Sequence, residues 1–496
     1  MMDTGESRKS GRKRGSIAAF GGKEEQYRSM AYDLYSESRI ARYSAFRKTA
    51  PPGLKPLTRH CLESMAANIN YYYQNISFLS KYRRLPEPMI NLLAELVAER
   101  MRGLPGEAVF TLFIKDCQPT RLNLSIWGNH TSILQSLKRH KEVCEVVKVF
   151  NMNDPPDSGK KEDVVAGVLK FMPNLISFDA RGCRKVSSQT VTIQDLKPIL
   201  ILPKLNVLKL SNTPLGSCKS IAAVINEIPS DSAAPLQRLK VSDTDFGSPP
   251  FEAIAKKFGK TLVCVDMMNT PCRKLAPLKY FDRLEKLNVS HLTKTKSGPN
   301  AELPKDFVSA LKESQHQSQV VRLRTFICGG SPDLAQRVLN SVIPSLPGLA
   351  RLSLYSCPGV TDLDIIFKTC LGLVNLDVSD TGIKDESFQI LSKAEVHQHT
   401  SIPNQPTIMV MPASRIRFLN ISKSRIGDLG ISYICRMPEL EELLLEATSI
   451  TEVGVKDVAI RTSVTHLNLT SCRGIAPADR RSLFASIRSG AKEKER

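Results

Sequence analysis

Long apolar runs and aromatic residues are scarce in this sequence. The 496 residues include one Trp, and aromatic residues make up 6% of the chain. No apolar run approaches the roughly 18 residues of a membrane-spanning helix, and the N-terminus, MMDTGESRKSGRKRG, lacks the apolar stretch of a secretory signal. We therefore expect a protein of the cytosol or nucleus that does not insert into a membrane.

Sequence patterns for metal binding and catalysis are also missing. The twelve cysteines form no CxxC pair, and no Cys/His cluster has zinc spacing. No phosphate-binding loop, HExxH, GxSxG or kinase signature is present. The sequence therefore predicts no enzyme activity, no metal and no cofactor.

The positive charge is large but spread along the chain. The formal net charge is +20, which concerns long-range attraction and not fold. Residues 1–56 read as a flexible basic arm, and residues 488–496 as a basic tail. We do not expect a nucleic-acid partner, because no aromatic and basic side chains alternate as a stacking platform requires. A nucleic-acid-associated protein of the nucleus remains the third hypothesis.

From Val109 onward a short pattern repeats. It has apolar residues at the first, fourth and sixth positions, followed by Cys, Thr or Ser at the ninth. We expect each unit to form a short parallel strand with a return helix, such as those predicted over 362–370 and 429–435, so that stacked units bury what one unit cannot. The repeat domain should span residues 106–487, with loop insertions near 291–319 and 392–412. Units start at Val109, Leu175, Leu205, Leu236, Leu262, Leu284, Leu349, Leu373, Ile416, Leu440 and Val464, with irregular units near 147–152 and 323–326.

These units resemble cysteine-containing leucine-rich repeats. The resemblance rests on LARLSLYSCPGVTDLD, LVNLDVSDTGIKDES and VTHLNLTSCRGIAPAD and covers residues 109–483. It implies an α/β fold, a leucine-rich repeat solenoid shaped as a horseshoe and preceded by a helical cap or box. Such solenoids are protein-binding modules. We expect the ninth-position cysteines in the core: Cys117, Cys183, Cys357 and Cys472.

Residues 57–105 predict a pair of amphipathic helices with a motif in each. Leu57, Cys61 and Met65, after Pro56, resemble the box by which substrate receptors bind the elongin B–elongin C adaptor. A second set resembles the cullin box that follows it. The order of boxes and repeats resembles the zyg-eleven and zer-one substrate receptors, and also leucine-rich repeat-containing protein forty-two. The second set is Leu85, Pro86, Met89 and Leu93.

Two alternatives for the helical pair stay open. It could cap the first repeat, because terminal repeats need a cover for their apolar face. It could also be an F-box, which precedes this repeat type and recruits another adaptor.

The outward strand positions predict the binding surface. We expect a concave face that is basic in its first half and acidic toward Glu442 and Glu446, and the basic half suits a partner with an acidic segment. A merely solvated surface is the alternative. The predicted partner-binding residues are Lys209, Arg238, Lys240, Lys286, Arg351 and Asp377.

Together these features favour a substrate-receptor subunit of a cullin–RING ubiquitin ligase that holds a protein substrate. The alternative is a scaffold or regulatory protein-interaction protein in which the helical pair is a cap.

Overall fold

The protein is described from a computed structural model, which covers most of the repeat region and the helices before it. The described residues are 57–74, 86–100, 105–115, 117–127, 130–152, 164–182, 193–292, 306, 309–310, 322–331, 336–392, 396–398, 408–410 and 413–484.

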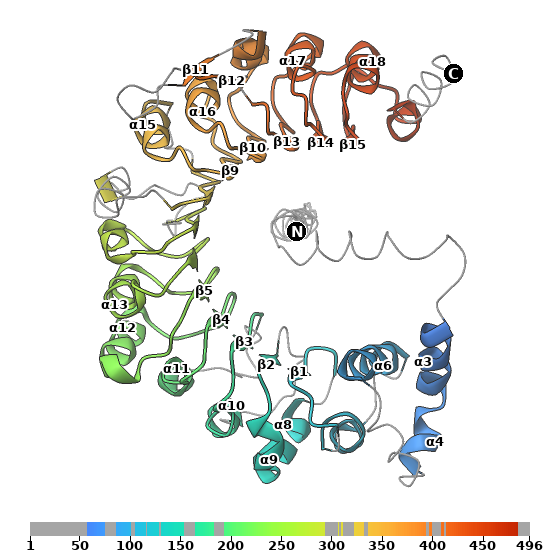
Figure 1. Ribbon diagram of the computed structural model, residues 1–496, viewed down its shortest axis with the longest axis vertical. Coiled ribbons are helices and arrows are strands. Elements are labelled where there is room, and N and C mark those ends of the chain that lie inside the picture. The colour runs from blue at the N-terminus through green and yellow to red at the C-terminus, as the bar shows by residue number, and fades with distance from the viewer. Residues whose placement is uncertain are drawn as a thin grey trace, which may run out of the picture.

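One parallel sheet of thirteen short strands runs through the molecule in chain order. The strands line the inner side of an open arc, and the helices lie on its outer side (Figure 1). The predicted leucine-rich repeat solenoid is therefore confirmed. The strands are β1 (Arg121–Asn123), β2 (Val149–Asn151), β3 (Ser177–Asp179), β4 (Val207–Lys209), β5 (Arg238–Lys240), β6 (Cys264–Asp266), β7 (Lys286–Asn288), β8 (Thr325–Ile327), β9 (Arg351–Ser353), β10 (Asn375–Asp377), β13 (Phe418–Asn420), β14 (Glu442–Leu444) and β15 (His466–Asn468).

The middle residue of each strand points into the core and stacks on its counterpart in the next repeat. Leu208 pairs in register with Leu239, and Leu239 with Val265. Because neighbouring side chains on a strand face opposite ways, the first and third residues point out of the core onto the concave side. The middle residues are Leu122, Phe150, Phe178, Leu208, Leu239, Val265, Leu287, Phe326, Leu352, Leu376, Leu419, Leu443 and Leu467.

A left-handed backbone position follows the strand in successive repeats. Asn212 has φ 57° and Asp243 has φ 58°, a conformation that is costly for residues with a side chain. It aims each N–H at the next repeat: that of Asn212 donates to the carbonyl of Ser242 at 2.8 Å. The ladder of backbone hydrogen bonds thus continues past the strands.

Ninth-position side chains bond to backbone carbonyls. The Cys357 thiol donates to the carbonyl of Cys328 at 3.3 Å, and the Thr213 hydroxyl to that of Ala180 at 2.8 Å. Burial raises the pKa of Cys357 to about 12, so its thiol is inert at neutral pH.

Two of the four expected core cysteines, Cys357 and Cys472, are fully buried. Cys117 is only half-buried, since it follows a helix and not a strand. Cys183 lies outside the described residues.

Helices return the chain along the outer side between strands, and two of them, α16 and α17, match the helices expected over 362–370 and 429–435. The α-helices of the repeats are α8 (His130–Arg139), α9 (Lys141–Glu145), α10 (Val164–Leu169), α11 (Ile193–Leu200), α12 (Cys218–Asn226), α13 (Ser248–Phe258), α15 (Gln336–Val342), α16 (Asp364–Thr369), α17 (Asp428–Ile434) and α18 (Glu452–Arg461). The 3₁₀ helices are η3 (Ser230–Ser232), η4 (Ala276–Tyr280), η5 (Ile343–Ser345), η6 (Asp385–Ser392) and η7 (Asp479–Arg481).

The first repeat unit was predicted wrongly. The unit expected at Val109, Leu112, Ile114 and Cys117 is helical, as α7 (Gly106–Val109) followed by one π-helical stretch, η2 (Phe110–Lys115). The first strand is β1, and its inward residue is Leu122. The irregular units near 147–152 and 323–326 do form strands, β2 and β8.

The insertion near 392–412 is not entirely loop, because β11 (Val396–Gln398) and β12 (Ile408–Val410) form an antiparallel pair there. Most of the insertion near 291–319 lies outside the described residues. No helix among the described residues has the length and apolar content needed to cross a membrane.

Candidate partner-binding surfaces

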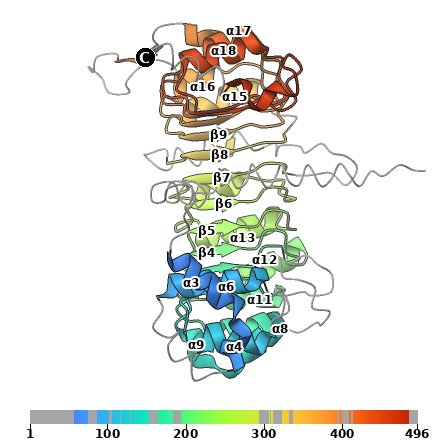
Figure 2. The same ribbon diagram turned by 90° about the vertical axis from the view of Figure 1, so that its right-hand side faces the viewer.

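Within the described part of residues 57–105, three helices lie at one end of the ladder of strands (Figure 2). They are α3 (Leu57–Ala67), α4 (Ile69–Gln74) and α6 (Glu87–Arg100). Glu87 lies in the first turn of α6, where a carboxylate favours the helix dipole, and Pro88 is tolerated there because that turn's N–H groups have no helical acceptor.

The first turn of helix α6 contacts β1, the strand at the edge of the sheet. The Glu87 carboxylate accepts hydrogen bonds from the Thr120 hydroxyl and from the backbone N–H of Arg121, both at 2.9 Å. Leu93 and Val97 of α6 are fully buried. An uncovered edge strand leaves unpaired backbone groups that invite unwanted pairing, and Glu87 accepts the bond from one such N–H group, that of Arg121.

Helix α3 packs on α6. Leu62 and Ala66 are almost fully buried on one face of α3, and so is Ile69 at the start of α4. Cys61 lies on another side of the helix and is exposed, while Met65 between these sides is half-buried against the core.

The predicted box residues therefore separate into two groups. Of the adaptor box, Leu57 opens α3 with its side chain outside the described residues, and Cys61 faces solvent. Of the cullin box, Pro86 is exposed, Met89 is half-buried and Leu93 is buried, while Leu85 lies outside the described residues. The two motifs are thus not presented together on one free face.

The concave surface carries the predicted cations. Register places Arg238 next to Val207, and Lys209 next to Lys240. Arg238 is exposed, while Lys209 and Lys240 are half-buried. Lys286 on β7, two strands further along the sheet, is also half-buried. Arg351 on β9 is also half-buried.

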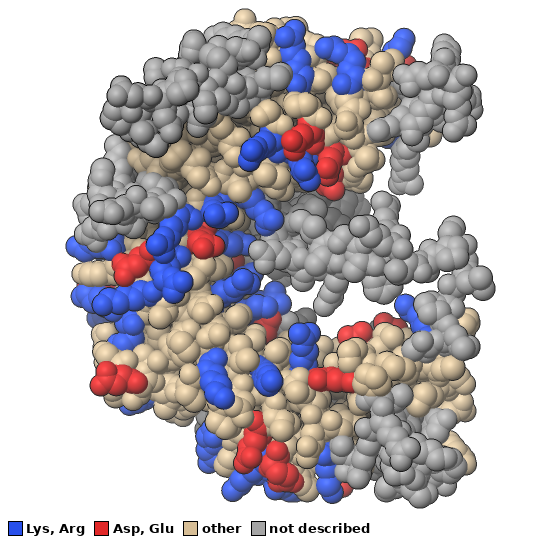
Figure 3. All heavy atoms as spheres, in the orientation of Figure 1, with Lys and Arg blue, Asp and Glu red and all other residues tan. Residues whose placement is uncertain are grey.

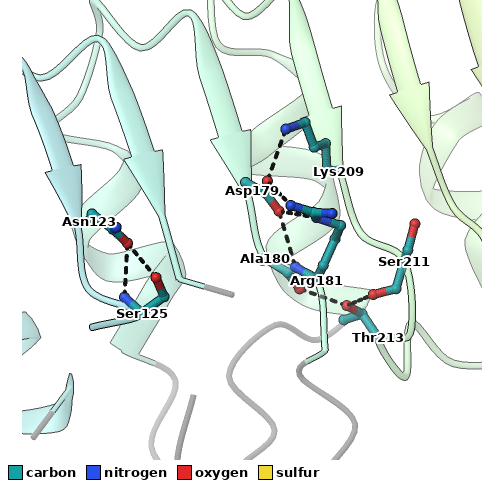
Figure 4. A network of polar contacts seen from close by, with 8 residues as sticks. All are labelled: Asn123, Ser125, Asp179, Ala180, Arg181, Lys209, Ser211 and Thr213. Atoms are coloured by element: carbon teal, nitrogen blue, oxygen red, sulfur yellow. Dashed lines mark hydrogen bonds and ion pairs between the residues drawn. The ribbon is translucent and has the colours of Figure 1, made fainter. Parts of the chain in front are cut away.

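A buried carboxylate is held at the start of this region (Figure 4). Arg181 Nε and Lys209 Nζ lie 2.9 and 3.0 Å from the two carboxylate oxygens of Asp179. Burial alone would raise the pKa of Asp179, but the hydrogen bonds and charges of Arg181 and Lys209 bring it below its usual range.

Asp377 has a structural role that the sequence analysis did not anticipate. It is 2% exposed and accepts hydrogen bonds from the Ser353 hydroxyl at 3.1 Å and the Ser379 hydroxyl at 2.7 Å. One carboxylate oxygen therefore bonds to the neighbouring repeat and the other to the turn that follows β10.

Asp266 is a second buried carboxylate that sequence reasoning missed. It accepts a hydrogen bond from the Ser242 hydroxyl at 2.7 Å. Burial raises the pKa of Asp266 to about 7, although hydrogen bonds from Met268 and Asn288 act to lower it. The available signal was its strand position, where most repeats place Asn or Asp before a turn.

Charged side chains of both signs lie along the arc. Lys and Arg side chains gather over the middle repeats on the face seen in Figure 3, where acidic side chains occur singly or in small groups. Toward the C-terminal repeats, Glu442 and Glu446 are both half-buried. Within the described part of the chain, no group of three or more His, Cys, Asp or Glu is arranged to hold a metal.

The stacked strands and return helices define a leucine-rich repeat protein. No family model matches the chain. Similar solved structures include an internalin from Listeria monocytogenes, 16% identical over 71% of this chain and 92% of that one with a TM-score of 0.41. The yeast Rad7 and Elc1 complex contains a chain that is 16% identical over 86% of this chain and 89% of that one, with a TM-score of 0.47. A leucine-rich repeat protein of Leptospira interrogans is 14% identical over 71% of this chain and 84% of that one, with a TM-score of 0.41. Likenesses this distant carry no argument about what this chain binds.

Proposed function

We propose that this chain is the substrate-receptor subunit of a cullin–RING ubiquitin ligase. In this proposal α3 docks the elongin B–elongin C adaptor, and the concave surface holds a protein substrate. The chain itself performs no chemistry; it brings the substrate close to the enzyme that transfers ubiquitin, which raises the effective concentration of the reacting groups.

One observation carries the adaptor role. Helix α3 packs on α6 and buries Leu62 and Ala66, while Cys61 of the box resembling the adaptor motif stays exposed. A docking helix needs this division, since one face must hold it on its own protein while another remains for the partner. The exposed start of α6 at Pro86 supports a cullin contact there.

A second candidate function is that of a scaffold without ligase activity. The burial of Leu93 and the contacts of Glu87 with Thr120 and Arg121 favour it, because both are what a simple cap requires. The two proposals differ in whether α3 binds an adaptor.

Adaptor binding is tested with the full chain and purified elongin B–elongin C in isothermal titration calorimetry. The double variant Leu57→Ser, Cys61→Asp should weaken binding by about a hundredfold, since it removes an apolar anchor and adds a charge at the contact. Ala67→Asp is the matched control, because Ala67 is exposed on the same helix about 120° around from Cys61.

The control should bind like the unmodified chain, and circular dichroism should show that all variants fold. Absence of binding by the unmodified chain, or equal loss in the control, would overturn the ligase proposal in favour of the scaffold. We also propose a location in the cytosol or nucleus, which imaging of a fluorescent fusion would check.

A further inference from the structure

The outward positions of six consecutive strands, β4 to β9, form a surface rich in cations. Parallel register joins Val207, Arg238, Cys264, Lys286, Thr325 and Arg351 in one row. It joins Lys209, Lys240, Asp266, Asn288, Ile327 and Ser353 in a second row. We call these two rows the basic surface. Its one carboxylate, Asp266, is 3% exposed and accepts bonds from within the fold.

The cations of the basic surface are crowded enough to repel each other. Burial and the positive charges of Lys286, Lys209 and Arg181 lower the pKa of Lys240 to about 8. A bound anion would relieve this repulsion, so the surface gains more from a negative partner than isolated surface lysines would.

The molecule already contains one example of the contact. Arg181 and Lys209 grip the Asp179 carboxylate at 2.9 and 3.0 Å beside the first strand of the basic surface (Figure 4). A carboxylate is therefore an anion whose size and geometry these side chains accommodate on this face.

We infer that the basic surface binds an acidic, extended segment of a protein partner that runs along the arc. Strands about 4.8 Å apart make β4 to β9 about 24 Å long, which an extended segment of about seven residues covers. This inference adds the chemical class of the partner to the proposed function. Only the identification of that partner as the ligase substrate rests on the proposed function.

The occupant is a peptide and not a nucleic acid. Neither row contains an aromatic side chain, whereas single-stranded nucleic acids are held by bases stacking on aromatic residues. The uncharged Cys264, Thr325 and Ile327 of the same rows are almost fully buried, so the exposed groups of the surface are mainly its cations.

The experiment uses the full chain and a fluorescein-labelled peptide of about eight glutamates, with the same peptide made of glutamine as the neutral probe. Fluorescence anisotropy should show binding of the glutamate peptide alone, weakening as salt is raised. Lys286→Glu and Arg238→Glu should each weaken it by about tenfold or more. Lys256→Glu is the matched control, since Lys256 is exposed on α13 on the outer side of the arc.

Equal binding of both peptides, or equal loss in the Lys256→Glu control, would overturn the inference. So would tighter binding of a single-stranded RNA of similar length and charge, which would make the surface a nucleic-acid site. Because the peptide assay does not involve α3, its failure is distinguishable from failure of adaptor binding.

Discussion

At the scale of single residues, the third position of each strand has two distinct uses. Where it is Asn or Asp, the side chain accepts the N–H two residues on: Asn123 from Ser125 at 3.1 Å, and Asn420 from Ser422 at 3.1 Å. These bonds form the turn that follows the strand. Where the position is Lys, as at Lys209 and Lys240, the side chain serves the concave surface. This difference separates the buried Asp377 from the cations that were predicted with it as partner-binding residues.

Replacing Asp266 with Asn should stabilise the protein at alkaline pH. The pKa of Asp266 is raised from 3.8 to about 7 in the fold. Its contribution to stability is therefore fully present below about pH 4 and lost as pH rises through 7, because a charged carboxylate becomes buried. Asn keeps the turn without the charge, as Asn288 does in the next strand. We expect the melting temperature of Asp266→Asn to exceed that of the unmodified chain by about 2 °C or more at pH 8 and not at pH 4.

Asp179→Asn is the control, because we expect it to change the melting temperature at pH 8 in the opposite direction. Because the pKa of Asp179 is lowered by Arg181 and Lys209, its stabilising contribution is present at neutral and alkaline pH and lost in acid. This variant should melt lower than the unmodified chain at pH 8. If both variants shift the melting temperature in the same direction at pH 8, the assigned environments are wrong.

At the scale of elements, the repeat period predicted the strands well because every repeat must bury the same inward positions. The prediction failed at the first unit. Val109, Leu112 and Ile114 have the spacing of a strand unit, but Val109, Leu112 and Phe113 also have the three- and four-residue spacing of a helix face. The apolar pattern alone does not distinguish a strand unit from a helix here, since both structures would bury most of the same residues. The sequence likewise could not show that Leu93 supports the cap while Cys61 is exposed, because helical spacing does not say which side meets a neighbour.

The contact between α6 and β1 should measurably stabilise the first repeat. Glu87→Ala removes the acceptor for the Thr120 hydroxyl and the Arg121 N–H, which we expect to cost about 1–3 kcal/mol. Urea denaturation measures the loss, and hydrogen exchange should accelerate within residues 121–127. Glu95→Ala, at an exposed position of the same helix, should change neither quantity. An equal loss in both variants would mean that helix composition, and not the edge contact, is responsible.

At the scale of the whole molecule, the arc depends mainly on contacts between neighbouring repeats. Each strand bonds to the strand before and after it, so stability is close to a sum of repeat and interface contributions. The concave surface is continuous only while this stack is unbroken, and both the proposed adaptor end and the basic surface belong to it.

The weakest joint in the stack should lie at β8, because the chain between β7 and β8 carries the long insertion near 291–319. Phe326 is 2% exposed and stacks in register between Leu287 and Leu352. Phe326→Ala should remove about 3–5 kcal/mol at this joint, so calorimetry should show two melting transitions in place of a single cooperative one. Leu443→Ala, near the C-terminal end, should accelerate hydrogen exchange in the last repeats alone. A single transition in Phe326→Ala, with exchange raised evenly along the chain, would show that the two halves unfold as one unit and that the joint at β8 is no weaker than the others.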